Sequence, residues 1–244
     1  MKSADDFDIV IIGSGAAGGM AALQLTKAGF RALVLETGRG YKPVTEAAMF
    51  QMPQSAPLRA TSTIDKQSGF FDATSDGGWT IQGEPYSVAP RSQPFQWWRS
   101  RMLGGRANHW GRVALRFGPY DFKPETRDGL GFDWPVTYDD IAPWYDFVER
   151  LIGVTGLPPG LANKPNSPPG ILLPPPEPRF HERLLDAAFA RLGMAVAAIH
   201  AAVLTRPLHG RAPCLYATQC TRGCRNRQSH DRLQFGRGRN PDWP

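Results

Sequence analysis

The residues best placed for chemistry lie near the start of the chain, where a glycine-rich turn follows an apolar run. The run 8–12 leads directly into Gly13, Gly15 and Gly18, spaced as G-x-G-x-x-G. In such a turn the first glycine permits a sharp bend and the second lets the backbone approach a pyrophosphate. The third lets the following helix pack closely on the strand. The pattern predicts a dinucleotide-binding site.

An acidic residue completes this pattern. A second apolar run, 32–35, ends in Glu36, which lies 18 residues after Gly18. A carboxylate at about this spacing accepts hydrogen bonds from the ribose of a dinucleotide. The helix expected over 17–27 would direct its first N–H groups at the phosphates. Residues 7–36 therefore predict a β-α-β unit.

A second glycine signature follows about ninety residues later, over 101–111. Gly104 and Gly105 are adjacent and precede polar and aromatic residues, which suits a loop lying against a planar ring and a pyrophosphate. The alternative is an ordinary turn with a buried pair, His109 and Trp110. The residues alone leave both interpretations open.

The three cysteines, Cys214, Cys220 and Cys224, are spaced C-x₅-C-x₃-C. Three thiolates so close in sequence can converge on one small metal centre. Alternatives are a zinc site completed by His209 or His230, a disulfide with one spare thiol, or three inert cysteines.

The chain has 244 residues, of which 41% are hydrophobic and 20% charged, with a formal net charge of +6. Six arginines against two aspartates give residues 221–244 a net +4, so the basicity belongs to this tail and argues poorly for nucleic-acid binding. No apolar run approaches the ~20 residues of a membrane span. No signal-peptide pattern precedes the first strand, so we expect a cytoplasmic location.

Several longer elements would position these motifs. Residues 40–95 lack periodicity and predict a long surface excursion. Thr137 and Asp140 form a capping box that starts a helix through Leu151, with a fresh turn at Pro143.

The second half of the chain alternates irregular and regular segments. Nine prolines make 156–178 an extended connector. Residues 180–192 predict an amphipathic helix, and 196–204 a strand. For the tail 225–244 two hypotheses remain: a disordered basic segment, or a reading frame that is wrong beyond about Cys224.

The two glycine signatures and the run Asp133-Trp134-Pro135 together resemble the glucose–methanol–choline (GMC) flavoprotein oxidoreductases. The bacterial FAD-dependent sugar and gluconate dehydrogenases are the most similar branch. Further matching residues are Tyr138, Asp139, Pro143, Tyr145 and Glu149. The resemblance covers most of residues 7–224. It implies FAD as the dinucleotide and an α/β fold: a Rossmann-like FAD/NAD(P)-binding domain of GMC type, incomplete here, with long irregular insertions.

The resemblance also implies a set of FAD-contacting residues: Gly13, Gly15, Gly18, Glu36, Gly104, Gly105, Asn108, His109, Trp110 and Val203. The first three would hold the pyrophosphate, Glu36 the adenosine ribose and Val203 the adenine. The glycine pair would approach the flavin end, with Asn108 and Trp110 beside the isoalloxazine ring. For His109 the family offers two alternatives, a covalent bond to the flavin 8α-methyl or a non-covalent place beside the ring.

The activity implied is oxidation of a CH–OH group in a sugar, sugar acid or polyol. Hydride would pass to flavin N5 and electrons to an acceptor other than NAD. Cys214, Cys220 and Cys224 are similar to the iron–sulfur motif of that branch, which relays electrons to a cytochrome. A small accessory subunit, and a periplasmic or membrane-associated location reached through a partner, are further implications.

In the family the catalytic histidine comes from a C-terminal substrate domain. We therefore expect residues 1–224 to be the N-terminal part of the FAD-binding domain, with that substrate domain absent. No catalytic residue is assigned, and this polypeptide alone should lack dehydrogenase activity. The alternatives are a non-catalytic flavin- or nucleotide-binding fragment and, more weakly, a nucleic-acid-binding protein acting through its arginine tail.

Overall fold

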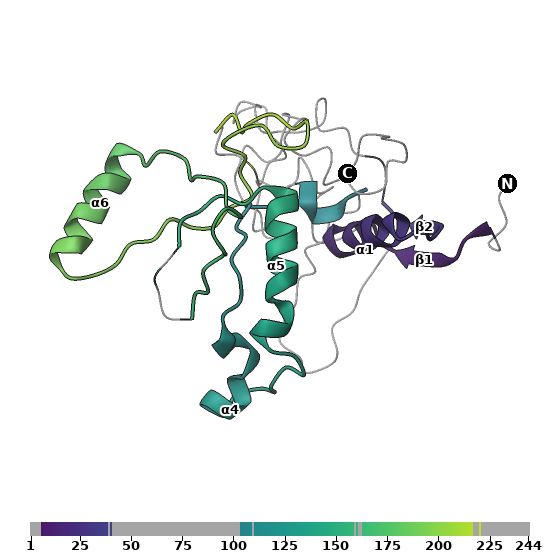
Figure 1. Ribbon diagram of the computed structural model, residues 1–244, viewed down its shortest axis with the longest axis horizontal. Coiled ribbons are helices and arrows are strands. Elements are labelled where there is room, and N and C mark those ends of the chain that lie inside the picture. Colours follow the sequence, from purple (N-terminus) through teal and green to yellow (C-terminus); the bar gives the residue numbers. More distant parts are fainter. Residues whose placement is uncertain are drawn as a thin grey trace, which may run out of the picture. The chain divides into compact units, whose positions relative to one another are not determined.

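The computed structural model describes residues 6–38, 40, 103–108, 110–158, 160, 163–216 and 220 (Figure 1). Nearly all of the expected excursion 40–95 and the whole tail 225–244 lie outside these residues, as do His109 and Cys224. The chain divides into two compact units: residues 1–111 with 215–244, and residues 112–214.

The first unit contains the predicted β-α-β motif. Strand β1 (Ile9–Ile12) is followed by helix α1 (Ala16–Lys27) and strand β2 (Ala32–Leu35). The two strands pair in parallel, with Ile9 opposite Ala32 and Ile12 opposite Leu35. The prediction for residues 7–36 is therefore confirmed, and Figure 1 shows the three elements side by side.

Helix α1 covers one face of this two-stranded sheet. Leu23 of the helix is buried, and the side chain of Ile11 lies under the helix, close to Gly18. On the opposite face Val10 and Ile12 remain 54% and 87% exposed. Parallel sheets are ordinarily covered on both faces. In this α/β arrangement helix α1 covers one face of the β1–β2 sheet, and the other face is exposed.

Most described residues of the second unit are irregular, and its regular elements are helices. Its helices are α4 (Pro124–Asp128), α5 (Tyr138–Ile152) and α6 (Phe180–Arg191), with a 3-10 helix over Pro119–Phe122. Among the described residues no helix is long and apolar enough to cross a membrane.

Helix α5 starts at the predicted capping box. The Asp140 N–H donates to Thr137 Oγ1, and the Thr137 N–H donates to Asp140 Oδ2 at 2.8 Å. The helix ends at Gly153, whose φ of +78° is the left-handed value that glycine adopts at little cost. Both ends of α5 are thus explained by their own residues.

The fresh turn expected at Pro143 is wrong, because α5 runs through this proline without a break. A proline inside a helix removes one backbone hydrogen bond and strains the turn before it. Here Arg116 bonds Tyr138 before the proline and both Asp146 and Glu149 after it. These long-range bonds connect Arg116 to the residues of the helix on both sides of the proline.

The strand expected over 196–204 is also wrong. Ala201 alone of these residues pairs, in antiparallel bridges with Val113 and Thr155. Thr155 in turn pairs with Leu173, the one bridging residue among the described part of the connector 156–178. Val196 and Ile199 are 52% and 55% exposed, so the first part of this segment does not pack as a buried strand would.

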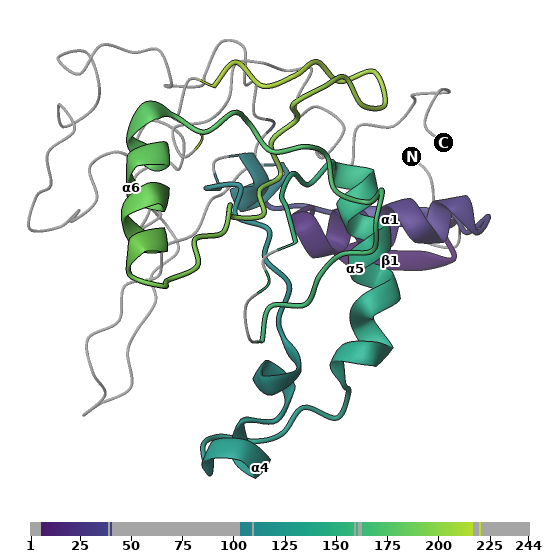
Figure 2. The ribbon, with the colours of Figure 1, turned by 60° about the vertical axis from the view of Figure 1, so that its left-hand side comes forward.

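Helix α6 forms where the sequence predicts it, yet none of its residues is buried. Phe180, Leu184 and Leu185 on it are each more than half exposed. Figure 2 shows the helix held between two extended connections. The apolar core around the C-terminal end of α5 consists of Leu151, Val154, Ile171, Ala202 and Leu204. Phe122 is also buried, but it packs separately, edge-on to the rings of Phe117 and Trp134.

Candidate dinucleotide-binding site

The first glycine turn is tied to both strands and to the helix. Gly13 has a φ of +89°, and its N–H donates to the Leu35 carbonyl of β2 at 2.7 Å. A Cβ on Gly18 would collide with the Gly13 carbonyl oxygen and press on Ile11. The structure thus gives a steric reason for the third glycine, because helix and turn approach too closely for any side chain.

The N-terminus of α1 presents unused backbone donors. Gly15 is the N-cap in an extended conformation, with no capping side chain, and the first turn has no acidic residue. The Gly19 N–H bonds the Gly15 carbonyl at 2.8 Å, so the N–H groups of Ala16 to Gly18 precede the helical ladder. Such donors, with the positive end of the helix dipole, suit a phosphate.

Glu36 follows β2 and points back to the first glycine turn. Its Oε2 accepts hydrogen bonds from the Ser14 N–H at 2.9 Å and the Ser14 hydroxyl at 2.5 Å. Its Oε1 accepts from the Gly38 N–H at 2.7 Å. Burial raises the pKa of Glu36, but the hydrogen bonds from Ser14, Gly38 and Thr37 together lower it below its ordinary value. An ionised carboxylate is therefore held beside the turn.

The second glycine loop lies against the first. The Gly104 N–H donates to Ser14 Oγ at 2.8 Å in a buried contact. A Cβ on Gly105 would reach within 3.9 Å of the Gly15 Cα, and Gly105 begins a 3-10 helix that ends at Asn108. The structure thus brings together two motifs that are separated by about ninety residues.

Asn108 secures this second loop. Its side-chain amide donates to the carbonyls of Leu103 and Gly105, both at 2.9 Å, and the residue is buried. Trp110 is half-buried in the same unit. The placement of Asn108 and Trp110 beside a flavin ring stays a prediction, as does the role of His109, which lies outside the described residues.

The remaining predicted residues are distributed over both units. Val203 and Cys214 belong to the second unit, whereas Cys220 belongs to the first. Within the described part of the chain no three His, Cys, Asp or Glu side chains are grouped so that they could hold a metal ion. Since Cys224 lies outside that part, the three-cysteine cluster is neither supported nor contradicted.

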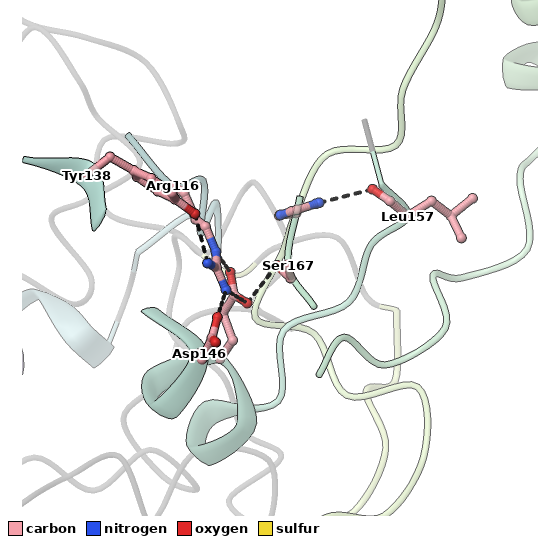
Figure 3. A network of polar contacts seen from close by, with 7 residues as sticks. Arg116, Tyr138, Asp146, Leu157 and Ser167 are labelled. Atoms are coloured by element: carbon pink, nitrogen blue, oxygen red, sulfur yellow. Dashed lines mark hydrogen bonds and ion pairs between the residues drawn. The ribbon is translucent and has the colours of Figure 1, made fainter. Parts of the chain in front are cut away.

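A polar network in the second unit has no counterpart in the sequence predictions (Figure 3). Arg116 is 4% exposed and binds both oxygens of Glu149, at 2.8 and 2.6 Å. It also donates to Asp146 at 2.6 Å and to the Tyr138 hydroxyl at 3.1 Å, and the Ser167 hydroxyl donates to Glu149 at 2.7 Å. Burial lowers the pKa of Arg116, but these acceptors raise it well above its ordinary value.

This network is structural in character. Arg116 fastens the segment that follows Arg112 to helix α5, and Arg211 caps the end of that helix by donating to the carbonyls of Leu151 and Ile152. Tyr138 and Glu149 are among the residues that carry the family resemblance. Nothing in the local pattern around Arg116 indicates its partners, which lie 22 to 33 residues away.

Comparison with known proteins supports FAD as the dinucleotide. The sequence model of the family described as "FAD binding domain" matches residues 8–90. This range contains the first glycine turn and Glu36. A helix N-terminus without a capping side chain, a turn with glycine at 13, 15 and 18, and an ionised carboxylate fit the phosphates and ribose of FAD. The match supports FAD as the cofactor and a Rossmann-like FAD-binding fold.

Three relatives are oxidases or dehydrogenases. The 6'''-hydroxyparomomycin C oxidase of Streptomyces lividus is 29% identical over 88% of this chain and 35% of its own length. The 2-methyl-1,2-propanediol dehydrogenase of Mycolicibacterium austroafricanum is 30% identical over 86% and 35%. The fructose dehydrogenase large subunit of Gluconobacter japonicus is 26% identical over 89% and 40%. The chain is thus similar to oxidoreductases and spans little more than a third of the length of these relatives.

Proposed function

We propose that this chain supplies the FAD-binding portion of a GMC-type oxidoreductase that oxidises a CH–OH group of a sugar, sugar acid or polyol. The observation that carries the proposal is the joining of the two glycine motifs through Ser14 and Gly104. The match of residues 8–90 to the FAD-binding family supports the cofactor. The names of two relatives, which contain a diol and a sugar, support the substrate class.

The residues of this chain bind and orient the cofactor. When bound, FAD supplies an acceptor for the hydride of the substrate carbinol. The N–H groups at the start of α1 hold the pyrophosphate, and Gly15 leaves space for it. Glu36 accepts from the adenosine ribose, and the loop at Gly104 and Gly105 lies toward the flavin.

The finer assignments belong to the same proposal. A covalent or non-covalent contact of His109 with the flavin, an iron–sulfur cluster on Cys214, Cys220 and Cys224, and adenine contact at Val203 are its site-level parts. Electrons pass to an acceptor other than NAD, with a cytochrome and a small accessory subunit as partners. The location is cytoplasmic or, through such a partner, periplasmic or membrane-associated.

The proposal assigns no catalytic base to these 244 residues. Turnover would need groups that correspond to the part of the relatives that this chain does not span. The 244-residue polypeptide is therefore expected to bind FAD without oxidising alcohols. The second candidate function, a flavin-binding fragment with no catalytic role in any assembly, shares the same binding site.

A titration and an activity assay test the proposal together. The purified 244-residue chain is titrated with FAD and, as the control ligand, with NAD, and both titrations are followed by isothermal titration calorimetry. We expect saturable binding of FAD and none of NAD, and no dye reduction with glucose, gluconate, fructose or polyols. Absence of FAD binding would overturn the proposed function. Dye reduction with one of these alcohols would contradict the assignment of the base to residues outside the chain.

A further inference from the structure

Ser14, the residue between the first two glycines, connects three segments of the first unit. It is 1% exposed. Its hydroxyl donates to Glu36 at 2.5 Å and accepts from the Gly104 N–H at 2.8 Å, while its own N–H also donates to Glu36. The hydroxyl therefore uses both its donor and its acceptor capacity. The end of β2, the first glycine turn and the second glycine loop all meet at this side chain.

These bonds fix the orientation of the Glu36 carboxylate. Oε2 accepts twice from Ser14, and Oε1 accepts from the Gly38 N–H. Removal of the hydroxyl would leave one of the two Ser14 bonds, because the backbone N–H remains. The carboxylate would then lose the donor that comes from a side chain and gain freedom to rotate.

The same hydroxyl anchors the second glycine loop. The Gly104 N–H is buried, so it needs an acceptor. Gly104 has a φ of +86° and Gly105 a φ of +50°. Glycine adopts these positive φ values readily, but it can also adopt many other conformations. The loop therefore needs contacts with other segments to keep one defined shape. The bond to Ser14 is one such contact, and the close approach of Gly105 to Gly15 is another.

We propose that Ser14 is a positioning residue for FAD, whose hydroxyl couples the ribose-binding carboxylate of Glu36 to the second glycine loop at Gly104. One side chain thereby sets the adenosine end and the flavin end of the site relative to each other. This inference rests on the proposed binding of FAD and deepens it. The Ser14 hydroxyl bonds Glu36 and Gly104 and does not itself contact the cofactor.

The test compares Ser14→Ala with a matched variant, Ser167→Ala. Ser167 is also a buried serine whose hydroxyl donates to a glutamate, but it lies in the second unit. The dissociation constant for FAD is measured for both variants and the wild type by flavin fluorescence, beside their urea unfolding curves. We expect Ser14→Ala to weaken FAD binding about tenfold, because Glu36 loses an orienting donor and the buried Gly104 N–H loses its acceptor. Ser167→Ala should leave FAD affinity unchanged, although both variants lose stability.

Two further measurements separate positioning from a general loss of structure. In a double-mutant cycle with Glu36→Gln, the Ser14→Ala effect on FAD affinity should shrink to less than about threefold, because the part of the effect that passes through the carboxylate is then absent. Without FAD, hydrogen exchange at the Gly104 amide should be about tenfold faster in Ser14→Ala than in the wild type.

The outcomes distinguish this inference from the proposed function. If the wild type fails to bind FAD, the proposed function fails and the role of Ser14 falls with it. If the wild type binds FAD and Ser14→Ala binds it equally well, the positioning role alone is overturned. Equal losses from Ser14→Ala and Ser167→Ala, or additive effects with Glu36→Gln, would also overturn it.

Discussion

Each of the two units of this chain contains a hydrogen-bonded glutamate carboxylate, but the donors that bind it differ between the units. In the first unit, Glu36 is partly buried and accepts hydrogen bonds from neutral donors, the N–H groups of Ser14 and Gly38 and the Ser14 hydroxyl. In the second unit, Glu149 is 3% exposed and its two oxygens are matched by the Arg116 guanidinium. The negative charge of Glu36 is bound by neutral donors beside a helix N-terminus, whereas the negative charge of Glu149 is balanced by the Arg116 guanidinium.

This difference separates a binding arrangement from a structural one. A buried ion pair whose donors and acceptors are all used offers nothing to a ligand and holds its own elements together. An oriented carboxylate at the surface, next to unused helix N–H groups, presents charge and donors to an incoming molecule. We therefore expect mutations in the second unit to change stability and mutations in the first to change ligand affinity.

The largest expected effect follows from removing Arg116. Arg116→Ala leaves Glu149 buried without its cation, so it should lower the free energy of unfolding by about 3–5 kcal/mol. Urea unfolding of the second unit measures this loss. The matched control is Arg127→Ala, because the Arg127–Asp128 pair has side chains that are 52% and 41% exposed. This ion pair and the contact of the Arg127 guanidinium with the Tyr120 ring should together contribute less than about 1.5 kcal/mol to the free energy of unfolding. Equal losses would remove the contrast between the two units.

The next effect separates binding from folding in the first unit. A Cβ on Gly15 would meet nothing within 4 Å, and its φ is −65°, so Gly15→Ala should fold normally. The same methyl group would occupy the space through which a pyrophosphate approaches. FAD affinity should therefore fall at least about tenfold, which corresponds to about 1.4 kcal/mol.

Gly111→Ala is the control for this variant, since a Cβ there also meets nothing within 4 Å. Calorimetric unfolding and FAD titration of both variants give the comparison. A Gly15→Ala protein that binds FAD as tightly as Gly111→Ala would show that the pyrophosphate does not lie at this turn.

The smallest expected effect is the loss of stability at acid pH through protonation of Glu36. The pKa of Glu36 in the folded chain lies below its ordinary value of 4.5, so its carboxylate stabilises the first unit at pH values above 4.5. This contribution is lost as the pH falls below 4.5 and through the lowered pKa of the folded state. The stability of the wild type should fall more steeply than that of Glu36→Gln between pH 5 and the acid limit of folding. Parallel urea titrations measure both slopes, and identical slopes would mean that the hydrogen bonds to Glu36 do not favour its ionised form.

Local patterns predict the β-α-β motif of the first unit well, for a physical reason. The turn from Gly13 to Gly18, the helix between the strands and the acidic end of β2 each depend on residues close in sequence. Ser14 is missed because the G-x-G motif leaves its middle position unspecified. Its importance comes from Gly104, which lies 90 residues away.

The second unit shows where local rules stop. The capping box at Thr137 is predicted because both partners lie within one turn. The fresh turn expected at Pro143 is wrong because α5 continues through the proline, with Arg116 bonded to residues on both sides of it, and local sequence does not indicate those bonds. The strand over 196–204 is wrong because a strand needs a partner along its length, and Ala201 alone finds one within the described residues.

Amide hydrogen exchange of the 244-residue chain, with and without FAD, tests most directly whether the two glycine motifs form one site. We predict that FAD slows exchange at residues 13–18 and at Gly104 and Gly105 together, with the same dependence on FAD concentration, while α5 is unaffected. Protection confined to residues 13–18, or protection at the two motifs with different concentration dependence, would contradict the single site.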